Sequence, residues 1–198
     1  MAEYQKIRPV IEPFSEKEIA KILKTIQAKD PWYGYYFRFA LLTGMRRSEI
    51  LSLTWNYVDM WLRKEITVPK ARHQNNQTPS ARRIPITPEL LTLLLDLRSP
   101  SKWVFQKTGK RMLGQTVSLF FRELSRDLGI YVNSERIRWT FAMRAYQQIA
   151  PSTAKEWKQL QHILGHRDGS TTKSYFLRNL NPPSDPESDP ETTEISPA

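Results

Sequence analysis

Apolar residues recur at helical spacing over most of the chain, with one interval of strand-like alternation. Ser15 and Glu18 have the spacing of a capping box, and apolar residues follow them at helical intervals. Alternation predicts strands at 65–68 and 83–86, and Pro85 suggests that the second is an edge strand. The predicted class is therefore mainly α with a small antiparallel β-sheet (α+β). Further helices are predicted at about 32–42, 46–53, 88–97, 115–128, 137–150, 152–164 and 170–177.

We interpret the chain as one domain with a short segment at each end. Residues 1–13 have two prolines and little periodicity, so we expect a linker or starting segment. Residues 14–181 form the domain, and the acidic residues 182–198 have a composition typical of disorder. The chain has no cysteine, which excludes disulfides, thiolate nucleophiles and Cys-ligated zinc. We see no signal peptide and expect no membrane-spanning segment, because no apolar run approaches about 20 residues.

The charge distribution is uneven. The chain has 30 Lys and Arg against 20 Asp and Glu, and five of these acids lie in residues 182–198, which have no base. Residues 1–181 therefore carry 30 bases and 15 acids, a net charge of +15. A domain this basic commonly binds a polyanion such as DNA or RNA. A solvated basic surface remains an open explanation on charge alone.

Three segments contain the residue types that metal-free phosphodiester exchange requires. They span 42–50, 135–142 and 164–175. A hydroxyl must attack phosphorus, and the charge that develops on the non-bridging oxygens needs fixed donors. Arginine suits this task because its planar fork binds phosphate oxygens bidentately. A lysine can protonate the leaving oxygen, and a tyrosine can remain as a covalent intermediate.

These segments resemble the three sequence boxes of the tyrosine recombinase (phage integrase) family. Residues 43–50 match T-G-[LM]-R-x-S-E-[LI], and residues 137–142 match the end of H-x-L-R-H-T-F-A apart from Trp139. Residues 164–175 match L-G-H-x-x-x-x-T-T-x-x-Y. The resemblance implies the catalytic-domain fold of DNA breaking-rejoining enzymes over 14–181. It also implies site-specific recombination through a 3′-phosphotyrosyl intermediate. The family usually has an N-terminal core-binding domain, which we expect to be absent from this chain.

The resemblance assigns a role to each polar residue of the three boxes. Arg46 and Arg138 would clamp the scissile phosphate, and Glu49, at i+3, would hold Arg46 through a side-chain pair. His166 would donate a hydrogen bond to the phosphoryl group. Tyr175 would attack phosphorus and form the covalent bond.

A catalytic lysine and the DNA-contacting residues are predicted outside these roles. Lys70 is the only lysine in the connection between the two strands, so we assign it as the general acid for the 5′-hydroxyl. This connection is longer than the family commonly has. The predicted DNA-binding residues are all arginines: Arg47, Arg72, Arg82, Arg83, Arg136 and Arg167.

Glu135 is the departure from the family pattern that bears on the chemistry. The family usually has His, sometimes Lys, three residues before the second arginine. A carboxylate could accept the tyrosine proton, so we keep Glu135 among the catalytic residues. It would also repel phosphate by about 4 kcal/mol at 4 Å with an effective dielectric of about 20. Our hypothesis is that Glu135 points away from the phosphate or that the enzyme is slow.

The resemblance implies no cofactor, because the phosphotyrosine conserves the bond energy. His162 and His166 have the i, i+4 spacing of a metal pair, but no Glu follows His162 and no cysteine exists, so we expect no metal. The implied partners are double-stranded DNA, three further copies in a tetramer on DNA, and accessory DNA-bending proteins. We expect no membrane partner, and a location in the cytoplasm at the nucleoid, in the host of a phage or mobile element.

Two other functions remain open. A type IB topoisomerase uses the same phosphotyrosine chemistry, and relaxation of supercoils without strand exchange would favour it. A non-catalytic DNA-binding relative would keep the fold and lose activity through Glu135. Specific binding without a covalent adduct would favour that alternative.

Overall fold

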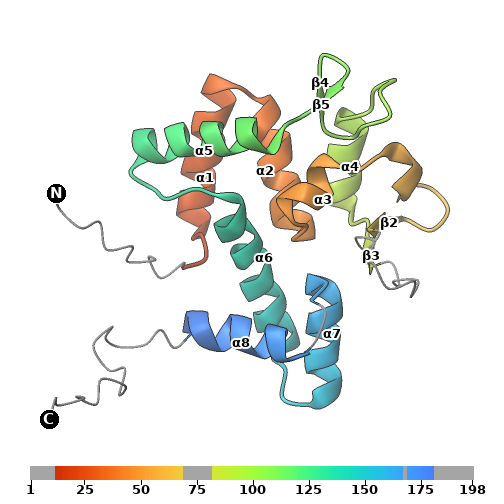
Figure 1. The fold of residues 1–198 in the computed structure, drawn as a ribbon, viewed down its shortest axis with the longest axis vertical. Coiled ribbons are helices and arrows are strands. Elements are labelled where there is room, and N and C mark those ends of the chain that lie inside the picture. The colour runs from red at the N-terminus through yellow and green to blue at the C-terminus, as the bar shows by residue number, and fades with distance from the viewer. Residues whose placement is uncertain (1–11, 69–81, 167–168, 181–198) are drawn as a thin grey trace, which may run out of the picture.

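A computed structural model describes residues 12–68, 82–166 and 169–180. The chain is mainly helical with small antiparallel sheets, as predicted (Figure 1). Most of residues 1–13, the hairpin connection and the acidic residues 182–198 lie outside the described residues. The helices are α1 (Glu16–Lys29), α2 (Trp32–Thr43), α3 (Arg47–Leu51), α4 (Pro88–Asp96), α5 (Gly114–Leu128), α6 (Ser134–Ile149), α7 (Ala154–Leu164) and α8 (Gly169–Leu180), with a 3-10 turn η1 (Trp55–Tyr57).

Local capping sets where the helices begin. The predicted capping box at Ser15 is confirmed. The Ser15 side chain accepts from the Glu18 backbone N–H, and the Glu18 carboxylate accepts from the Ser15 backbone N–H. The helix predicted at 137–150 begins earlier: the Asn133 side chain accepts from the Arg136 backbone N–H at 2.6 Å, so α6 starts at residue 134. Glu135 therefore lies in the first turn of α6.

The larger sheet has the strand order β1-β2-β3, from β1 (Val58–Asp59), β2 (Glu65–Val68) and β3 (Arg82–Pro85). The predicted hairpin is confirmed, since β2 and β3 pair antiparallel with Glu65 opposite Pro85. Pro85 lies on an edge strand, where its missing N–H breaks no ladder. The second strand begins one residue earlier than predicted. A two-stranded sheet, β4 (Gln106–Lys107) and β5 (Lys110–Arg111), was not predicted.

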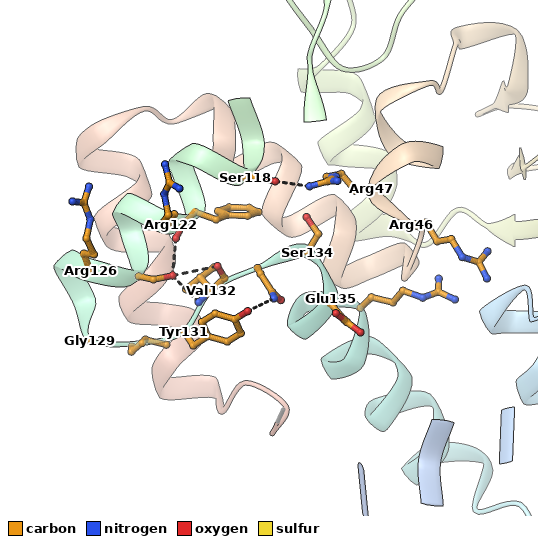
Figure 2. A pocket seen from close by; sticks show the side chains of 15 residues that line it. Arg46, Arg47, Ser118, Arg122, Arg126, Gly129, Tyr131, Val132, Ser134 and Glu135 are labelled. Atoms are coloured by element: carbon orange, nitrogen blue, oxygen red, sulfur yellow. Dashed lines mark hydrogen bonds between the residues drawn. The ribbon is translucent and has the colours of Figure 1, made fainter. Parts of the chain in front are cut away.

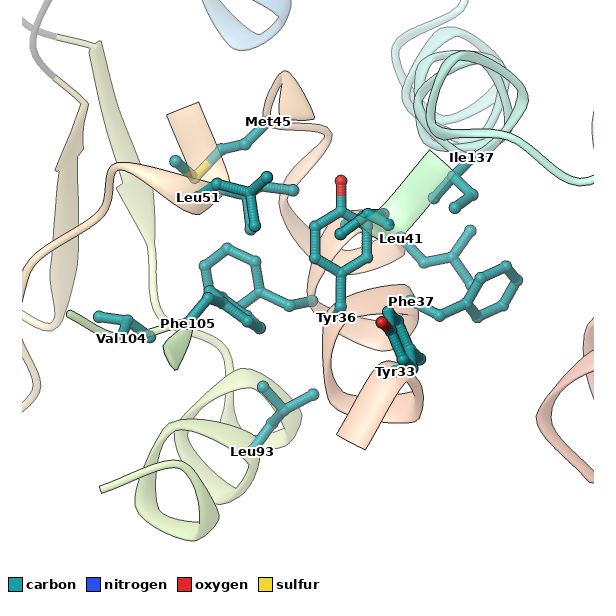
Figure 3. Close-up of a cluster of buried hydrophobic side chains, with 14 of the residues drawn as sticks. Tyr33, Tyr36, Phe37, Leu41, Met45, Leu51, Leu93, Val104, Phe105 and Ile137 are labelled. Carbon is teal, nitrogen blue, oxygen red and sulfur yellow. The ribbon is translucent and has the colours of Figure 1, made fainter. Parts of the chain in front are cut away.

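Most of the buried side chains form one large cluster, here called the main core. It combines residues of α1 to α5, the larger sheet and the start of α6. Figure 3 shows the part of it where side chains of α2, α3, α4 and α6 meet. Fully buried rings of Tyr36, Phe37, Phe105 and Phe121 pack edge-on or tilted at its centre. The Tyr36 hydroxyl lies 3.2 Å from Oγ of Ser134. Burial raises the pKa of Tyr36 to about 12, so the ring stays neutral.

A second, smaller cluster lies between α6, α7 and α8, and is here called the C-terminal cluster. Phe176 is its centre, 4.8 Å from the Tyr146 ring and 5.4 Å from the Trp139 ring. Helix α6 joins the two clusters, since Ile137 is in the main core (Figure 1). No helix within the described ranges is long and apolar enough to cross a membrane. The buried members of the C-terminal cluster are Trp139, Ala142, Met143, Ala145, Leu160, Leu164 and Phe176.

Candidate active site

Arg46 is held at the start of α3 by Glu49. The Arg46 backbone N–H donates to Oε2 of Glu49 at 2.7 Å, and Nη1 donates to Oε1 at 3.1 Å. The predicted Arg46–Glu49 pair is therefore present, and the backbone bond fixes the carboxylate as well. Gly44 precedes this turn with φ of 58°, and a methyl group there would collide with the Phe141 ring. A residue with a side chain at position 44 would displace the turn that carries Arg46.

Arg138 lies in α6 at the junction between the two clusters. Its side chain is buried, with the residue 9% exposed. Nη1 donates to the Gly44 carbonyl, and Nη2 donates to the Leu164 carbonyl. One guanidinium thus joins the turn before Arg46 to the end of α7. Because a buried charge is stable only with partners, these bonds fix the place of Arg138.

His166 follows the end of α7 and is also 9% exposed. Gly165 ends the helix with φ of 63°, a left-handed conformation that glycine adopts without strain. The imidazole Nδ1 lies 3.1 Å from Oγ1 of Thr172 on α8. This contact orients the ring, and the second ring nitrogen, Nε2, is the atom the proposed phosphate bond would use.

Tyr175 lies on α8, three residues after Thr172. Thr172 contacts His166, and Phe176 anchors the helix in the C-terminal cluster. Helix α8 is therefore held by one contact three residues before Tyr175 and by another at the residue after it. The side chain of Tyr175 is not among the described parts of the chain.

The end of α7 gathers three arginines. Nη2 of Arg46 donates to the Gly165 carbonyl at 3.2 Å, and Nη1 of Arg82 donates to the Leu164 carbonyl at 3.2 Å. Arg138 donates to the same Leu164 carbonyl. Carbonyls at a helix C-terminus have no partner within the helix and carry partial negative charge. This helix end is therefore the acceptor that brings both predicted phosphate-clamping arginines beside His166.

Glu49 is ionised within this cluster of positive charge. Burial alone would raise its pKa, but the charges of Arg82 and Arg46 and the Arg46 backbone N–H hold the pKa below its ordinary value. Nη2 of Arg82 donates to Oε2 of Glu49 at 3.0 Å. The carboxylate thus has two arginine partners, and it compensates part of the charge that the site concentrates.

A pocket opens beside the site between α3, α5 and the start of α6 (Figure 2). Arg46, Arg138 and Glu135 line it together, so Glu135 does not lie on a different face from the two arginines. Arg122 and Arg126 extend this lining along α5. The pocket is therefore strongly basic, with Glu135 as the one acidic side chain in its lining.

The structure separates the predicted DNA-binding arginines into two groups. Arg83 is exposed, and Arg47 is exposed while donating to Oγ of Ser118. Arg82 is 4% exposed and bound inside the protein. Arg136 stacks on the Phe14 ring at 4.1 Å, and its three side-chain nitrogens donate to protein oxygens of Glu12, Tyr131 and Glu18. Neither of these two guanidiniums faces solvent. Lys70, Arg72 and Arg167 lie outside the described residues.

Sequence reasoning missed three features of the site. It gave no role to Thr172, which contacts the histidine, although the T-T of the third box was visible. It did not select Arg122 and Arg126, whose i, i+4 spacing places them on one face of α5. It expected Arg82 at the surface. Within the described ranges, no group of three or more His, Cys, Asp or Glu side chains could hold a metal ion.

Comparisons with known proteins identify the family. The sequence model of the Phage integrase family matches residues 12–181, and the chain therefore belongs to this family of tyrosine recombinases. It is 25% identical over 209 residues to a XerC-like tyrosine recombinase of Caldanaerobacter subterraneus subsp. tengcongensis, covering 87% of this chain and 51% of the relative. The chain thus spans about half the length of this curated relative.

Solved structures show the same fold. The Tn1549 transposon integrase in complex with circular intermediate DNA superposes with a TM-score of 0.67 at 21% identity, covering 83% of this chain and 60% of the other. The catalytic domain of bacteriophage HP1 integrase gives a TM-score of 0.57 at 22% identity, covering 88% and 97%. A lambda integrase dimer bound to a COC′ core site gives 0.65 at 17% identity, covering 93% and 51%.

Proposed function

We propose that residues 14–181 are the catalytic domain of a site-specific DNA recombinase that acts through a 3′-phosphotyrosyl intermediate. The observation that carries the proposal is the convergence of Arg46, Arg138 and His166 at the end of α7. Tyr175 follows on the next helix. Two arginines and one imidazole supply the donors that a phosphoryl transition state requires. The partner is double-stranded DNA, which we propose is recombined by four copies with accessory DNA-bending proteins.

In the proposed reaction, the Tyr175 hydroxyl attacks phosphorus and the bond from phosphorus to the 5′-oxygen breaks. Glu135, at the family's histidine position, accepts the phenol proton, and Lys70 protonates the leaving 5′-oxygen. Arg46 and Arg138 neutralise the charge that develops on the non-bridging oxygens. Attack by another strand's 5′-hydroxyl then reverses these steps. Because the phosphotyrosine conserves the bond energy, the cycle needs no ATP and no metal.

DNA contact outside the clamp is proposed for the exposed basic side chains. Arg83 lies on the edge strand, and Arg47 lies at the pocket with Arg122 and Arg126. Together these groups would bind phosphates on one side of the scissile bond. Each phosphate contact makes the affinity fall by about 0.9 log unit per log unit of salt.

A non-catalytic DNA-binding relative is the second candidate. It is favoured by one observation, the presence of the Glu135 carboxylate in the same pocket as Arg46 and Arg138. A negative charge there opposes phosphate binding at the position where the family has a cation or neutral imidazole.

Covalent trapping separates these candidates. A duplex is selected from a random-sequence pool by binding to this chain, nicked within the bound region, and incubated with the protein before a denaturing gel. We expect an adduct with the wild type and none with Tyr175→Phe. Tyr146→Phe is the matched control, because Tyr146 is a phenol of the C-terminal cluster, and it should keep the adduct. Binding without any wild-type adduct would favour the non-catalytic relative.

A further inference from the structure

Arg82 and Arg83 are neighbours on β3 with opposite environments. Side chains alternate between the two faces of a strand. The Arg82 side chain is 5% exposed, whereas that of Arg83 is 65% exposed. The two arginines are therefore not interchangeable, and only Arg83, which pairs with Glu65 at 3.7 Å, is exposed to a ligand in solvent.

The buried guanidinium of Arg82 joins the two halves of the proposed site. Nη2 donates to Oε2 of Glu49 at 3.0 Å, and Nη1 donates to the Leu164 carbonyl at 3.2 Å. Glu49 belongs to the short helix after Arg46, and Leu164 is the last residue of α7. One side chain from the sheet thus ties the Arg46–Glu49 pair to the helix end that precedes His166.

Gly165 leaves the space that Arg82 occupies. A methyl group at position 165 would collide with Nη1 of Arg82 and lie 3.0 Å from its Cζ. The same residue has φ of 63°, so two independent features require glycine there. The backbone that leads to His166 therefore packs directly against the Arg82 side chain.

We propose that Arg82 is a positioning residue of the recombinase site, which locks the end of α7 onto Glu49 and so places His166 beside Arg46. The inference rests on the proposed function, and it reassigns Arg82 from a DNA contact to an internal brace. Lysine could not replace it, because a point charge on a flexible stem reaches one of the two acceptors but does not span both in a fixed plane.

Amide hydrogen exchange tests, without DNA, whether the Arg82 hydrogen bonds to Glu49 and Leu164 hold the end of α7 in place. Exchange at the Gly165 and His166 amides, which bond the His162 and Gln161 carbonyls, is compared across variants of the full chain. In Arg82→Met we expect exchange at least about tenfold faster there, with α2 unchanged. Arg82→Lys should lie between wild type and Arg82→Met, and this variant also serves if Arg82→Met does not fold. Arg144→Met is the matched control, because Arg144 pairs with Glu16 on another face and should change neither amide.

Adduct formation tests whether the brace matters for chemistry. With the selected nicked duplex at saturation, Arg82→Met should form adduct about 100-fold more slowly, because small displacements of catalytic groups have effects of this size. Its dissociation constant for the duplex should change less than about threefold, since a buried residue makes no phosphate contact. Arg82→Lys should recover part of the rate, and Arg144→Met should match wild type.

A double variant shows whether Arg82 acts through Glu49. When Glu49→Gln is already present, Arg82→Met should slow adduct formation by clearly less than it does alone. Unchanged amide exchange in Arg82→Met would overturn the inference, as would faster exchange with an unchanged rate. If the wild type forms no adduct, the proposed function fails, and the exchange experiment still decides the role of Arg82.

Discussion

The main core and the C-terminal cluster differ in size and in how they are held. The main core draws on five helices, the larger sheet and the start of α6, with many fully buried rings. The C-terminal cluster contains seven buried residues among those described. The main core carries Arg46 and Glu49, and the C-terminal part of the chain carries His166 and Tyr175. The proposed site therefore lies where the main core meets the C-terminal cluster.

Hydrogen bonds from arginines, rather than apolar packing, join the two regions at the end of α7. Arg46, Arg82 and Arg138 all donate to the Leu164 or Gly165 carbonyl, and these bonds cross between the two regions. Charge-assisted hydrogen bonds have stricter geometry than apolar contacts. The alignment of the site therefore depends on a few arginines, while the stability of the fold depends on the main core.

The largest expected effect is on the free energy of global unfolding, which should depend on the main core more than on the C-terminal cluster. Phe121→Ala in the main core should lower the free energy of global unfolding by about 3–5 kcal/mol. Phe176 is equally buried, but it packs only within the C-terminal cluster. Phe176→Ala should therefore increase amide exchange in α7 and α8 while changing the denaturation midpoint much less. Equal loss of global stability in both variants would show that the chain unfolds as one cooperative unit.

The second effect concerns the junction itself. Gly165→Ala should cost about 1–2 kcal/mol for the left-handed conformation, and more because the new methyl group collides with Arg82. Gly129→Ala is the matched control, since Gly129 has φ of 64° and a methyl group there would meet no atom within 4 Å. Thermal unfolding should therefore show a larger loss for Gly165→Ala. Equal losses would mean that Arg82 moves aside freely.

The third effect tests the charge of the pocket. Glu135→His removes a carboxylate beside Arg46 and Arg138 and restores the family's usual residue. We expect adduct formation at least about tenfold faster, because a repelling charge is removed and a neutral base remains. Glu135→Gln is the control that removes the charge without supplying a base. An unchanged rate in Glu135→His would contradict the hypothesis that Glu135 slows the reaction.

The smallest effect concerns the start of α7. The backbone N–H groups of Thr153 and Ser152 lower the pKa of Glu156 from its ordinary value to about 2. Because the folded-state pKa is lower, the stabilisation is complete above about pH 4.5 and is lost as the pH falls towards 2. Amide exchange in the first turn of α7 should rise over this interval. In Glu156→Gln the exchange, corrected for the intrinsic pH effect, should lose that pH dependence.

Local patterns in the sequence predicted those structural features that depend on residues close together in the chain. The Ser15–Glu18 capping box, the β2 strand and the Arg46–Glu49 pair involve residues no more than four apart. The start of α6 was missed because periodicity marks the buried turns of a helix, whereas its first turn depends on the Asn133 cap.

The environments of the arginines could not be predicted in this way. Arg82 and Arg83 are adjacent, and alternation shows only that they face opposite sides, not which side is buried. Arg82 owes its burial to Glu49 and Leu164, which lie 33 and 82 residues away. Arg136 likewise depends on Phe14, just before α1, and on Glu18 in its first turn, both more than 100 residues away. A basic residue in a strongly basic domain can therefore be bound inside the protein instead of lying exposed at its surface.

The proposed function depends above all on Tyr175 as the residue that carries the DNA. Peptide mass spectrometry of the wild-type adduct after nuclease digestion locates the residue that retains a nucleotide 3′-phosphate. We predict this mass on the peptide that contains Tyr175, with the linkage at its phenolic oxygen. A nucleotide on any other residue, or an adduct of unchanged yield in Tyr175→Phe, would contradict the proposal.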